Sequence, residues 1–225
     1  VGRIRLIVTE AGVGVRLLGD VGASTDDVVL TAAGQIQLQG ALTAQRDLSV
    51  SGHGITTQNA VAAAGRNLAL AGGTGALDLT GGKLGADGNA TFSGASLTDH
   101  GGTGAIRFAG NTLALNTIGT SVISDATWNG SSAMNLLAGS LSTSGNTQLS
   151  SVAAGTPSGG VSLATSGDLA LGGNAQVVGS SAVQLTSSNG NLTLGTSGAV
   201  QSGDALQITA SAGSFTRFLR KARSR

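Results

Sequence analysis

The side chains that could act on a substrate are few in this chain and lie far apart. Cleavage of a glycosidic bond needs two carboxyl groups that flank the bond, and the candidates are Asp26, Asp27, Asp125, Asp168 and Asp204. Asp26 and Asp27 are adjacent, so as strand neighbours they would point to opposite faces. The other three are distant in sequence, and the chain has one Trp and no Tyr to form a sugar platform. We therefore predict no catalytic residues and expect that the protein is not an enzyme.

Residues that could hold a metal ion are equally isolated. His53 and His100 have no His, Cys or carboxylate at ligand spacing on the same element, so we interpret both as surface turn residues. The sequence from Gly72 resembles the calcium-binding pattern Gly-Gly-x-Gly-x-Asp, but Leu77 occupies the Asp position and Asp78 follows one residue late. We predict that Asp78 is an outward strand residue, and we expect no metal site and no cofactor.

The composition indicates an ordered chain with an almost uncharged body. Of the 225 residues, 40% are apolar and 10% are charged, against about 25% charged residues in ordinary domains. No Cys is present, so disulfides and thiolate metal sites are excluded. Five of the twelve basic residues fall in the last nine positions, which leaves 7 basic residues against 11 acidic ones. The body therefore has no basic face for nucleic acid, and we expect neither a nucleic-acid partner nor a small-molecule substrate.

Two further observations concern the ends of the sequence and membranes. No apolar stretch approaches the ~20 residues of a membrane-spanning helix. The chain begins without Met, and no charged segment followed by an apolar run and a small-residue cleavage site opens it. We interpret the sequence as a piece of a longer protein.

The elements on which any functional side chain must be mounted are short strands in a repeat. Alternating triplets begin at Val161, Val183 and Leu206, which are 22 and 23 residues apart, and a fixed period of this size is typical of solenoids. Turn-forming Gly, Ser and Asn separate the triplets. Three strands and three turns make one coil of a parallel β-helix, whose apolar side is buried only when coils stack. We predict an all-β rod over residues 1–213, with roughly ten coils of 20–23 residues.

The alternation within each triplet also predicts which side chains form the core, because residues i and i+2 of a strand share a face. Four apolar side chains are expected to point inward, and four polar ones outward. The inward set is Leu163, Leu185, Leu194 and Ile208, and the outward set is Ser162, Gln184, Thr193 and Gln207.

Two segments depart from this repeat. Between about residues 99 and 157 the short strands continue without clear phase. There, residues 120–130, which carry Trp128, predict a distorted or extended turn, and Pro157 predicts another turn. Residues 214–225 form a basic tail in which four apolar side chains recur at the spacing of an amphipathic helix. Three interpretations of the tail are open. It could form a helix that caps the open end of the rod, it could form a basic segment that lies on a membrane surface, or it could be a chain end unrelated to the rod.

Several units of the repeat resemble filamentous haemagglutinin-like exoproteins of Gram-negative bacteria. They are residues 5–15 (RLIVTEAGVGV), 27–38 (DVVLTAAGQIQL), 65–70 (GRNLAL) and 190–194 (GNLTL). The resemblance implies a right-handed parallel β-helix that is exported by two-partner secretion through an outer-membrane transporter. It implies a secreted or cell-surface location and a structural rod of an adhesin, whose partner would be a host-cell receptor or glycan.

Two alternatives to the adhesin remain open at this point. The same kind of rod serves as the stalk of a toxin-delivery exoprotein, whose partner would be a neighbouring bacterial cell. Polysaccharide-active enzymes also use parallel β-helices, but the scattered carboxylates described above disfavour that function.

Overall fold

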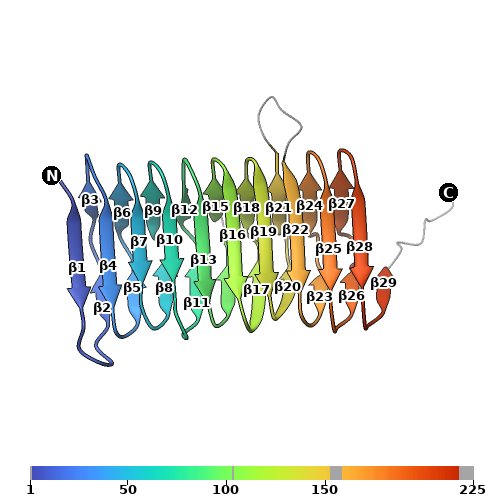
Figure 1. Cartoon of the computed structure of the whole chain (residues 1–225), viewed down its shortest axis with the longest axis horizontal. Coiled ribbons are helices and arrows are strands. Elements are labelled where there is room, and N and C mark those ends of the chain that lie inside the picture. The colour runs from blue at the N-terminus through green and yellow to red at the C-terminus, as the bar shows by residue number, and fades with distance from the viewer. Residues whose placement is uncertain (1, 103, 153–158, 218–225) are drawn as a thin grey trace.

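The computed structural model describes residues 2–102, 104–152 and 159–217 of the chain. Within these residues every regular element is a β-strand, and the strands form three parallel sheets that run the length of the molecule (Figure 1). Successive strands along the chain enter sheet A, sheet B and sheet C in turn. Nine coils with three strands each result, followed by a tenth coil with two strands. This confirms the prediction of a parallel β-helix of roughly ten coils, while its right-handed winding remains a prediction.

The strand bounds follow this order within each sheet. Sheet A contains β1 (Ile4–Val8), β4 (Val28–Ala32), β7 (Leu48–Ser51), β10 (Leu68–Ala71), β13 (Ala90–Gly94), β16 (Thr112–Thr117), β19 (Ala133–Ala138), β22 (Gly160–Thr165), β25 (Val183–Ser187) and β28 (Leu206–Ala210). Sheet B contains β2 (Val15–Leu17), β5 (Ile36–Leu38), β8 (Ile55–Gln58), β11 (Leu77–Thr80), β14 (Leu97–His100), β17 (Thr120–Ser124), β20 (Ser140–Ser144), β23 (Leu169–Leu171), β26 (Leu192–Leu194) and β29 (Phe215–Arg217). Sheet C contains β3 (Val21–Ala23), β6 (Ala41–Ala44), β9 (Val61–Ala64), β12 (Lys83–Ala86), β15 (Ile106–Ala109), β18 (Thr127–Gly130), β21 (Gln148–Ser151), β24 (Gln176–Gly179) and β27 (Ala199–Ser202).

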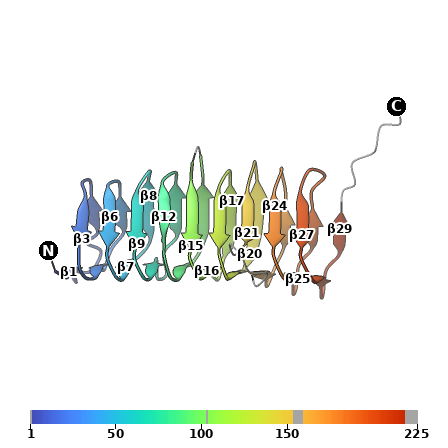
Figure 2. The same ribbon diagram turned by 90° about the horizontal axis from the view of Figure 1, so that it is seen from above.

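The coils stack one after another along a single axis, with β1 and β29 at opposite ends (Figure 2). Each strand pairs in register with the strand of the coil before and the coil after. For example, Val28 is paired with Leu48, which lies 20 residues later, and Met134 is paired with Val161, which lies 27 residues later. The longer coil includes residues 153–158, so the turn predicted at Pro157 falls outside the described residues.

One continuous core fills the rod, because in-register stacking brings the inward positions of all three sheets together. Leu163 and Leu185 are fully buried, as predicted, while Gln184 is exposed and Ser162 is half-buried. Leu194 is only partly buried against this core, since it lies close to the last coil. The part of the chain that the structure describes contains no helix that could cross a membrane.

Two predictions about irregular segments need correction. Trp128 does not lie in a distorted turn: it is a fully buried residue of β18, and residues 120–130 supply two regular strands of the sixth coil. The tail does not begin with a helix, because residues 215–217 form β29, which pairs with β26 and extends the rod beyond residue 213. Residues 218–225 lie outside the described part.

Candidate functional site

A charged cluster interrupts the apolar core in the middle of the rod. It consists of Asp99 on β14, Arg107 on β15 and Trp128 on β18, and we call it the Asp99 cluster. Arg107 donates from Nε to Asp99 Oδ2 at 3.1 Å and from a terminal nitrogen to Asp99 Oδ1 at 2.8 Å. The indole nitrogen of Trp128 donates to Asp99 Oδ2 at 2.8 Å. All three side chains have 0% of their surface exposed. Charge-assisted, two-point pairs of this kind belong to the strong class of hydrogen bonds in proteins.

The remaining contacts of the cluster tie three consecutive coils together. The other terminal nitrogen of Arg107 donates to the carbonyl oxygens of Gly82 in the fourth coil, at 3.1 Å, and of Ile106, at 3.2 Å. The Trp128 ring in the sixth coil packs on Phe92 in the fifth, with 5.2 Å between ring centroids and 54° between planes. The charged groups therefore have the partners that burial requires.

Coil register explains why Arg107 points inward. The order Ile106-Arg107-Phe108 reads as a strand with its apolar residues inside, but the structure has the opposite orientation. Pairing places Arg107 between Leu84 and Trp128 on an inward row of sheet C, which leaves Ile106 and Phe108 half-buried on the outer face. Phe108 lies over Gly85, where an added Cβ would be 2.4 Å from Phe108 Cδ1, so only glycine fits beneath the ring.

Sequence reasoning missed the Asp99 cluster, although one signal for it was present. Asp99 follows Leu97 by two residues on the same short strand, so a period of two already places its carboxylate inward. Burial raises the pKa of Asp99, and the charge of Arg107 and the hydrogen bond from Trp128 act in the opposite direction. Both carboxylate oxygens are occupied and no cluster side chain reaches solvent. In this arrangement the cluster offers no group to a substrate.

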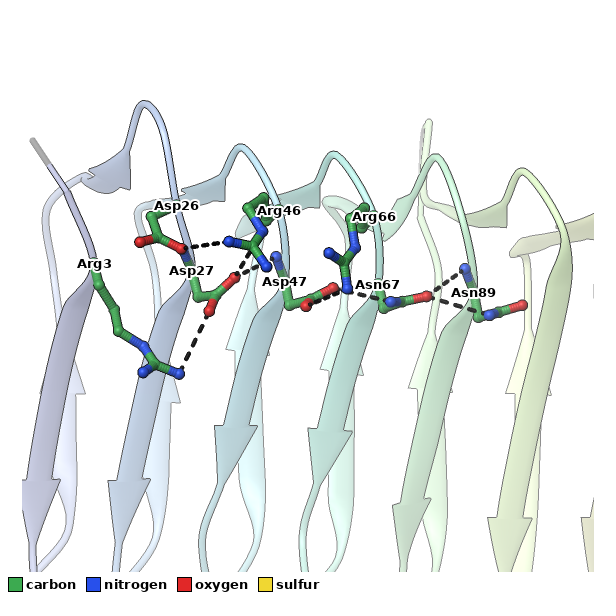
Figure 3. A network of polar contacts seen from close by, with 8 residues as sticks. All are labelled: Arg3, Asp26, Asp27, Arg46, Asp47, Arg66, Asn67 and Asn89. Carbon is green, nitrogen blue, oxygen red and sulfur yellow. Dashed lines mark hydrogen bonds and ion pairs between the residues drawn. The ribbon is translucent and has the colours of Figure 1, made fainter.

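A second polar feature follows the corner between sheets C and A across the first coils (Figure 3). We call it the corner ladder; it comprises Arg3, Asp26, Asp27, Arg46, Asp47, Arg66, Asn67 and Asn89. Each acidic or amide side chain contacts the next coil: Asp27 Oδ1 accepts from the Asp47 backbone N–H at 3.2 Å, and Asn67 Oδ1 from that of Asn89 at 3.2 Å. Each arginine contacts a carboxylate of a neighbouring coil, as Arg66 does with Asp47 at 3.1 Å. Such exposed pairs stabilise a fold only slightly.

The corner ladder corrects the expected orientation of the two adjacent carboxylates. Asp26 and Asp27 do not point to opposite faces, because they lie in the turn before β4 and not within a strand. Both approach Arg46, whose nitrogens are 3.3 Å from Asp26 Oδ1 and 3.8 Å from Asp27 Oδ1. Their charges are therefore compensated on the surface, away from any second pair of carboxylates.

The other candidate carboxylates lie at three different corners of the rod. Asp125 lies in the turn that precedes β18 of sheet C, and its Oδ1 accepts a hydrogen bond from the Asn146 backbone N–H at 2.9 Å. Asp168 lies in the turn that precedes β23 of sheet B, and its Oδ1 accepts a hydrogen bond from the Asn191 backbone N–H at 2.7 Å. Asp204 precedes β28 in sheet A. The structure does not bring these residues together, and Asp125 and Asp168 act as hydrogen-bond acceptors between successive coils.

The candidate metal-binding residues are also separate. His53 is exposed and its Nδ1 lies 2.9 Å from Thr74 Oγ1, while His100 is exposed at the end of β14. Asp78 lies on the outer face of β11 between the buried residues Leu77 and Leu79. Within residues 2–102, 104–152 and 159–217, no group of three or more His, Cys, Asp and Glu side chains is placed to hold a metal ion.

We therefore predict that stability does not depend on metal ions or on thiol chemistry. The melting temperature should stay unchanged within the measurement error when EDTA or a reducing agent is added, because metal release is destabilising only where ligands are gathered. Thermal unfolding followed by circular dichroism, with and without each reagent, checks this. A substantial decrease in EDTA that calcium reverses would reveal a site that the sequence and the described residues do not show.

Fold and polar features together define a β-solenoid rod with a hydrogen-bonded surface and one buried charged cluster. By sequence, the chain is similar to the protein named Toxin CdiA from Yersinia pestis, with 46% identity over 50 residues. These residues are 22% of this chain and 2% of that protein, so the chain corresponds to a very small part of its relative's length. No protein-family model matches the chain, and no solved structure does.

Proposed function

We propose that the chain is a structural rod segment of a larger exoprotein at the surface of a Gram-negative bacterium. The observation that carries the proposal is the uninterrupted stacking of the coils, with three parallel sheets and one core from the first coil to the last. In a solenoid of this kind each coil contacts only its neighbours, so stacked coils form an extended rod with two separated ends. The rod would hold whatever precedes and follows it at a fixed separation.

The first role that we propose for this rod is in an adhesin, where it extends a binding region away from the cell. The resemblance of residues 5–15, 27–38, 65–70 and 190–194 to filamentous haemagglutinin-like exoproteins supports this role. The same resemblance supports export through an outer-membrane transporter of a two-partner secretion system. The partner of the displayed region would be a host-cell receptor or a glycan.

The second role is the stalk of a toxin-delivery exoprotein, and one specific observation favours it. The relative found by sequence is named as a toxin, and the 50 matched residues lie within a chain that is entirely rod in its described part. A stalk would present a toxic domain to a neighbouring bacterial cell. The two roles differ in the domain that the parent protein carries on the rod, so the parent's sequence distinguishes them.

In either role we propose that the rod itself is not catalytic. Asp125 and Asp168 accept hydrogen bonds at separate corners, and the buried Asp99 is held in the ion pair with Arg107. This supports a mechanical function over the polysaccharide-active alternative, which needs two carboxylates across one cleft.

A deletion of one coil tests the rod function. Removing residues 48–67 joins Asp47 to Leu68 and takes out β7, β8 and β9, so that β4 can pair with β10 in the register it now has with β7. We expect the variant to melt cooperatively within a few degrees of the wild type, because stability in such a stack is a sum over coils and their interfaces. In the parent exoprotein, surface display and binding or toxicity should be retained.

The control is a deletion of residues 59–67 alone, which removes β9 and leaves one coil without its strand in sheet C. This shorter deletion should abolish cooperative melting, because the strands that follow would enter the wrong sheets. If the one-coil deletion eliminates the activity of the parent while the rod remains folded, the third coil takes part in recognition and the purely mechanical role is wrong.

A further inference from the structure

One inward row of sheet A presents the same kind of interior from the second coil to the sixth. On sheet A the inward row reads Val28, Leu48, Leu68, Ala90 and Leu113, all of them buried aliphatic side chains. Rows of this kind specify that an apolar side chain faces inward, but they do not specify which coil lies next to which. A chain that skips one coil while folding still satisfies them, and such misassembly is a characteristic failure of repeat proteins.

The Asp99 cluster differs from these rows because its partners are specific and come from different coils. Asp99 and Arg107 belong to the fifth coil, and the indole N–H that completes the cluster belongs to the sixth. In the fourth coil, the residues at the positions of Asp99 and Arg107 are Leu79 and Leu84. Stacking the sixth coil on the fourth would therefore bury the Trp128 N–H against leucines, without the Asp99 carboxylate that accepts from it, and an unpaired buried donor is costly.

The contacts of the corner ladder, which align the earlier coils on the surface, end near the Asp99 cluster. Along the corner ladder, Asn89 Oδ1 accepts from the Thr112 backbone N–H at 3.3 Å, where the sixth coil begins. At this corner the next two coils begin with Ala133 and Gly160, which carry no side chain able to accept such a bond. The run of acidic and amide acceptors at this corner thus ends where the Asp99 cluster joins the fifth and sixth coils, and only hydroxyl contacts from Ser180 and Ser202 follow at this corner in the described residues.

We propose that the Asp99 cluster fixes the coil register of the rod, by permitting the sixth coil to stack only on the fifth. Its role is the choice of neighbour, and only secondarily stability, because a buried ion pair contributes little net stability compared with well-packed apolar side chains. The cluster lies midway along the stack, so it determines the alignment of the two halves.

Cysteine cross-linking tests the proposal. The chain contains no Cys of its own, so every disulfide must come from the introduced residues. Ala69, Thr91 and Ala114 are paired neighbours on the outer face of β10, β13 and β16. The pair Ala69→Cys with Thr91→Cys reports the register seen in the structure. The pair Ala69→Cys with Ala114→Cys forms a disulfide only when the fifth coil is skipped, since bonded cysteines need Cα atoms within about 7 Å.

The decisive variant replaces the whole cluster with apolar residues: Asp99→Leu, Arg107→Met and Trp128→Phe. After refolding from denaturant, we expect its melting temperature to stay close to that of the wild type. The cross-link that reports skipping should rise about tenfold or more, which is the discrimination that one unsatisfied buried donor supplies. Leu163→Ala, which changes the core in the eighth coil, is the control. Its melting temperature should decrease, but the amount of this cross-link should not rise.

Either of two results overturns the proposal. One is a triple variant that melts cooperatively and gives no more of the skipped cross-link than the wild type. The other applies if the triple variant does not fold. Trp128→Phe keeps the ion pair and removes the indole N–H through which the sixth coil distinguishes the fifth from the fourth, together with part of the ring. A skipped cross-link in Trp128→Phe that equals the wild-type level would then show that the cluster does not select the register.

Discussion

Replacing Asp99 alone with leucine should lower the free energy of unfolding by about 3–5 kcal/mol, because it leaves Arg107 as a buried charge without a counter-ion. The guanidinium of Arg107 donates two hydrogen bonds to Asp99, and Trp128 donates a third. In the variant these donors remain in a core from which water is excluded, with only the Gly82 and Ile106 carbonyls still accepting from Arg107. Chemical denaturation followed by circular dichroism measures the loss.

Asp168→Leu is the matched control, since it makes the same change at an exposed carboxylate on the corner before β23. It removes one hydrogen bond to the Asn191 backbone N–H and leaves no buried charge, so the expected loss is about 1 kcal/mol or less. Equal losses in the two variants would mean that the buried ion pair opens to solvent readily and that its burial is not a feature of the folded rod in solution.

Comparison of the Asp99→Leu variant with the apolar triple variant separates two roles of the cluster. A large loss in the single variant together with a small loss in the triple variant is the behaviour of a buried ion pair that costs as much desolvation as it gains in attraction. Such a cluster is retained for the structure that it selects. A large loss in both variants would assign the cluster to stability alone.

The architecture was accessible from the sequence because one coil and its repeat follow from local rules. Alternating triplets give strands, glycine and asparagine between them give turns, and the recurrence from Val161 to Val183 to Leu206 gives the stack. These rules also placed Leu163 and Leu185 in the core. These rules compare residues a few positions apart in sequence, or residues at equivalent positions of neighbouring coils. They do not require knowing which side chains contact each other in the core.

The Asp99 cluster was not accessible by the same rules, because it breaks the pattern on which they rest. Polar residues at inward positions make the phase of the repeat look lost between residues 99 and 157, although the strands there remain regular. The orientation of Arg107 depends on the pairing of β15 with β12, which local alternation contradicts. For a similar reason Phe215 fits a helical spacing in the sequence but continues sheet B, because the β26 edge is available to pair with it.

The sharpest test of the inward and outward assignment is a pair of aspartate substitutions at adjacent positions of β25. Leu185→Asp places a carboxylate in the core, where Leu185 has 0% of its surface exposed, and should cost several kcal/mol in the free energy of unfolding. Leu185 lies between Leu163 and Ile208 on the inward row of sheet A, so none of these row neighbours supplies a donor. The expected result is a clear decrease in melting temperature or a failure to fold.

Gln184→Asp introduces the same side chain one residue earlier, on the outer face. Gln184 is exposed, and its amide donates to Gln207 Oε1 at 3.2 Å, a contact between two solvated side chains that contributes little. The expected loss is therefore less than about 1 kcal/mol. Both variants add one carboxylate to the same strand, and the carboxylate lies on opposite faces of β25 in the two. Similar melting losses for both would show that β25 does not hold the register seen here, and the inward row from Leu163 to Ile208 would have to be reassigned.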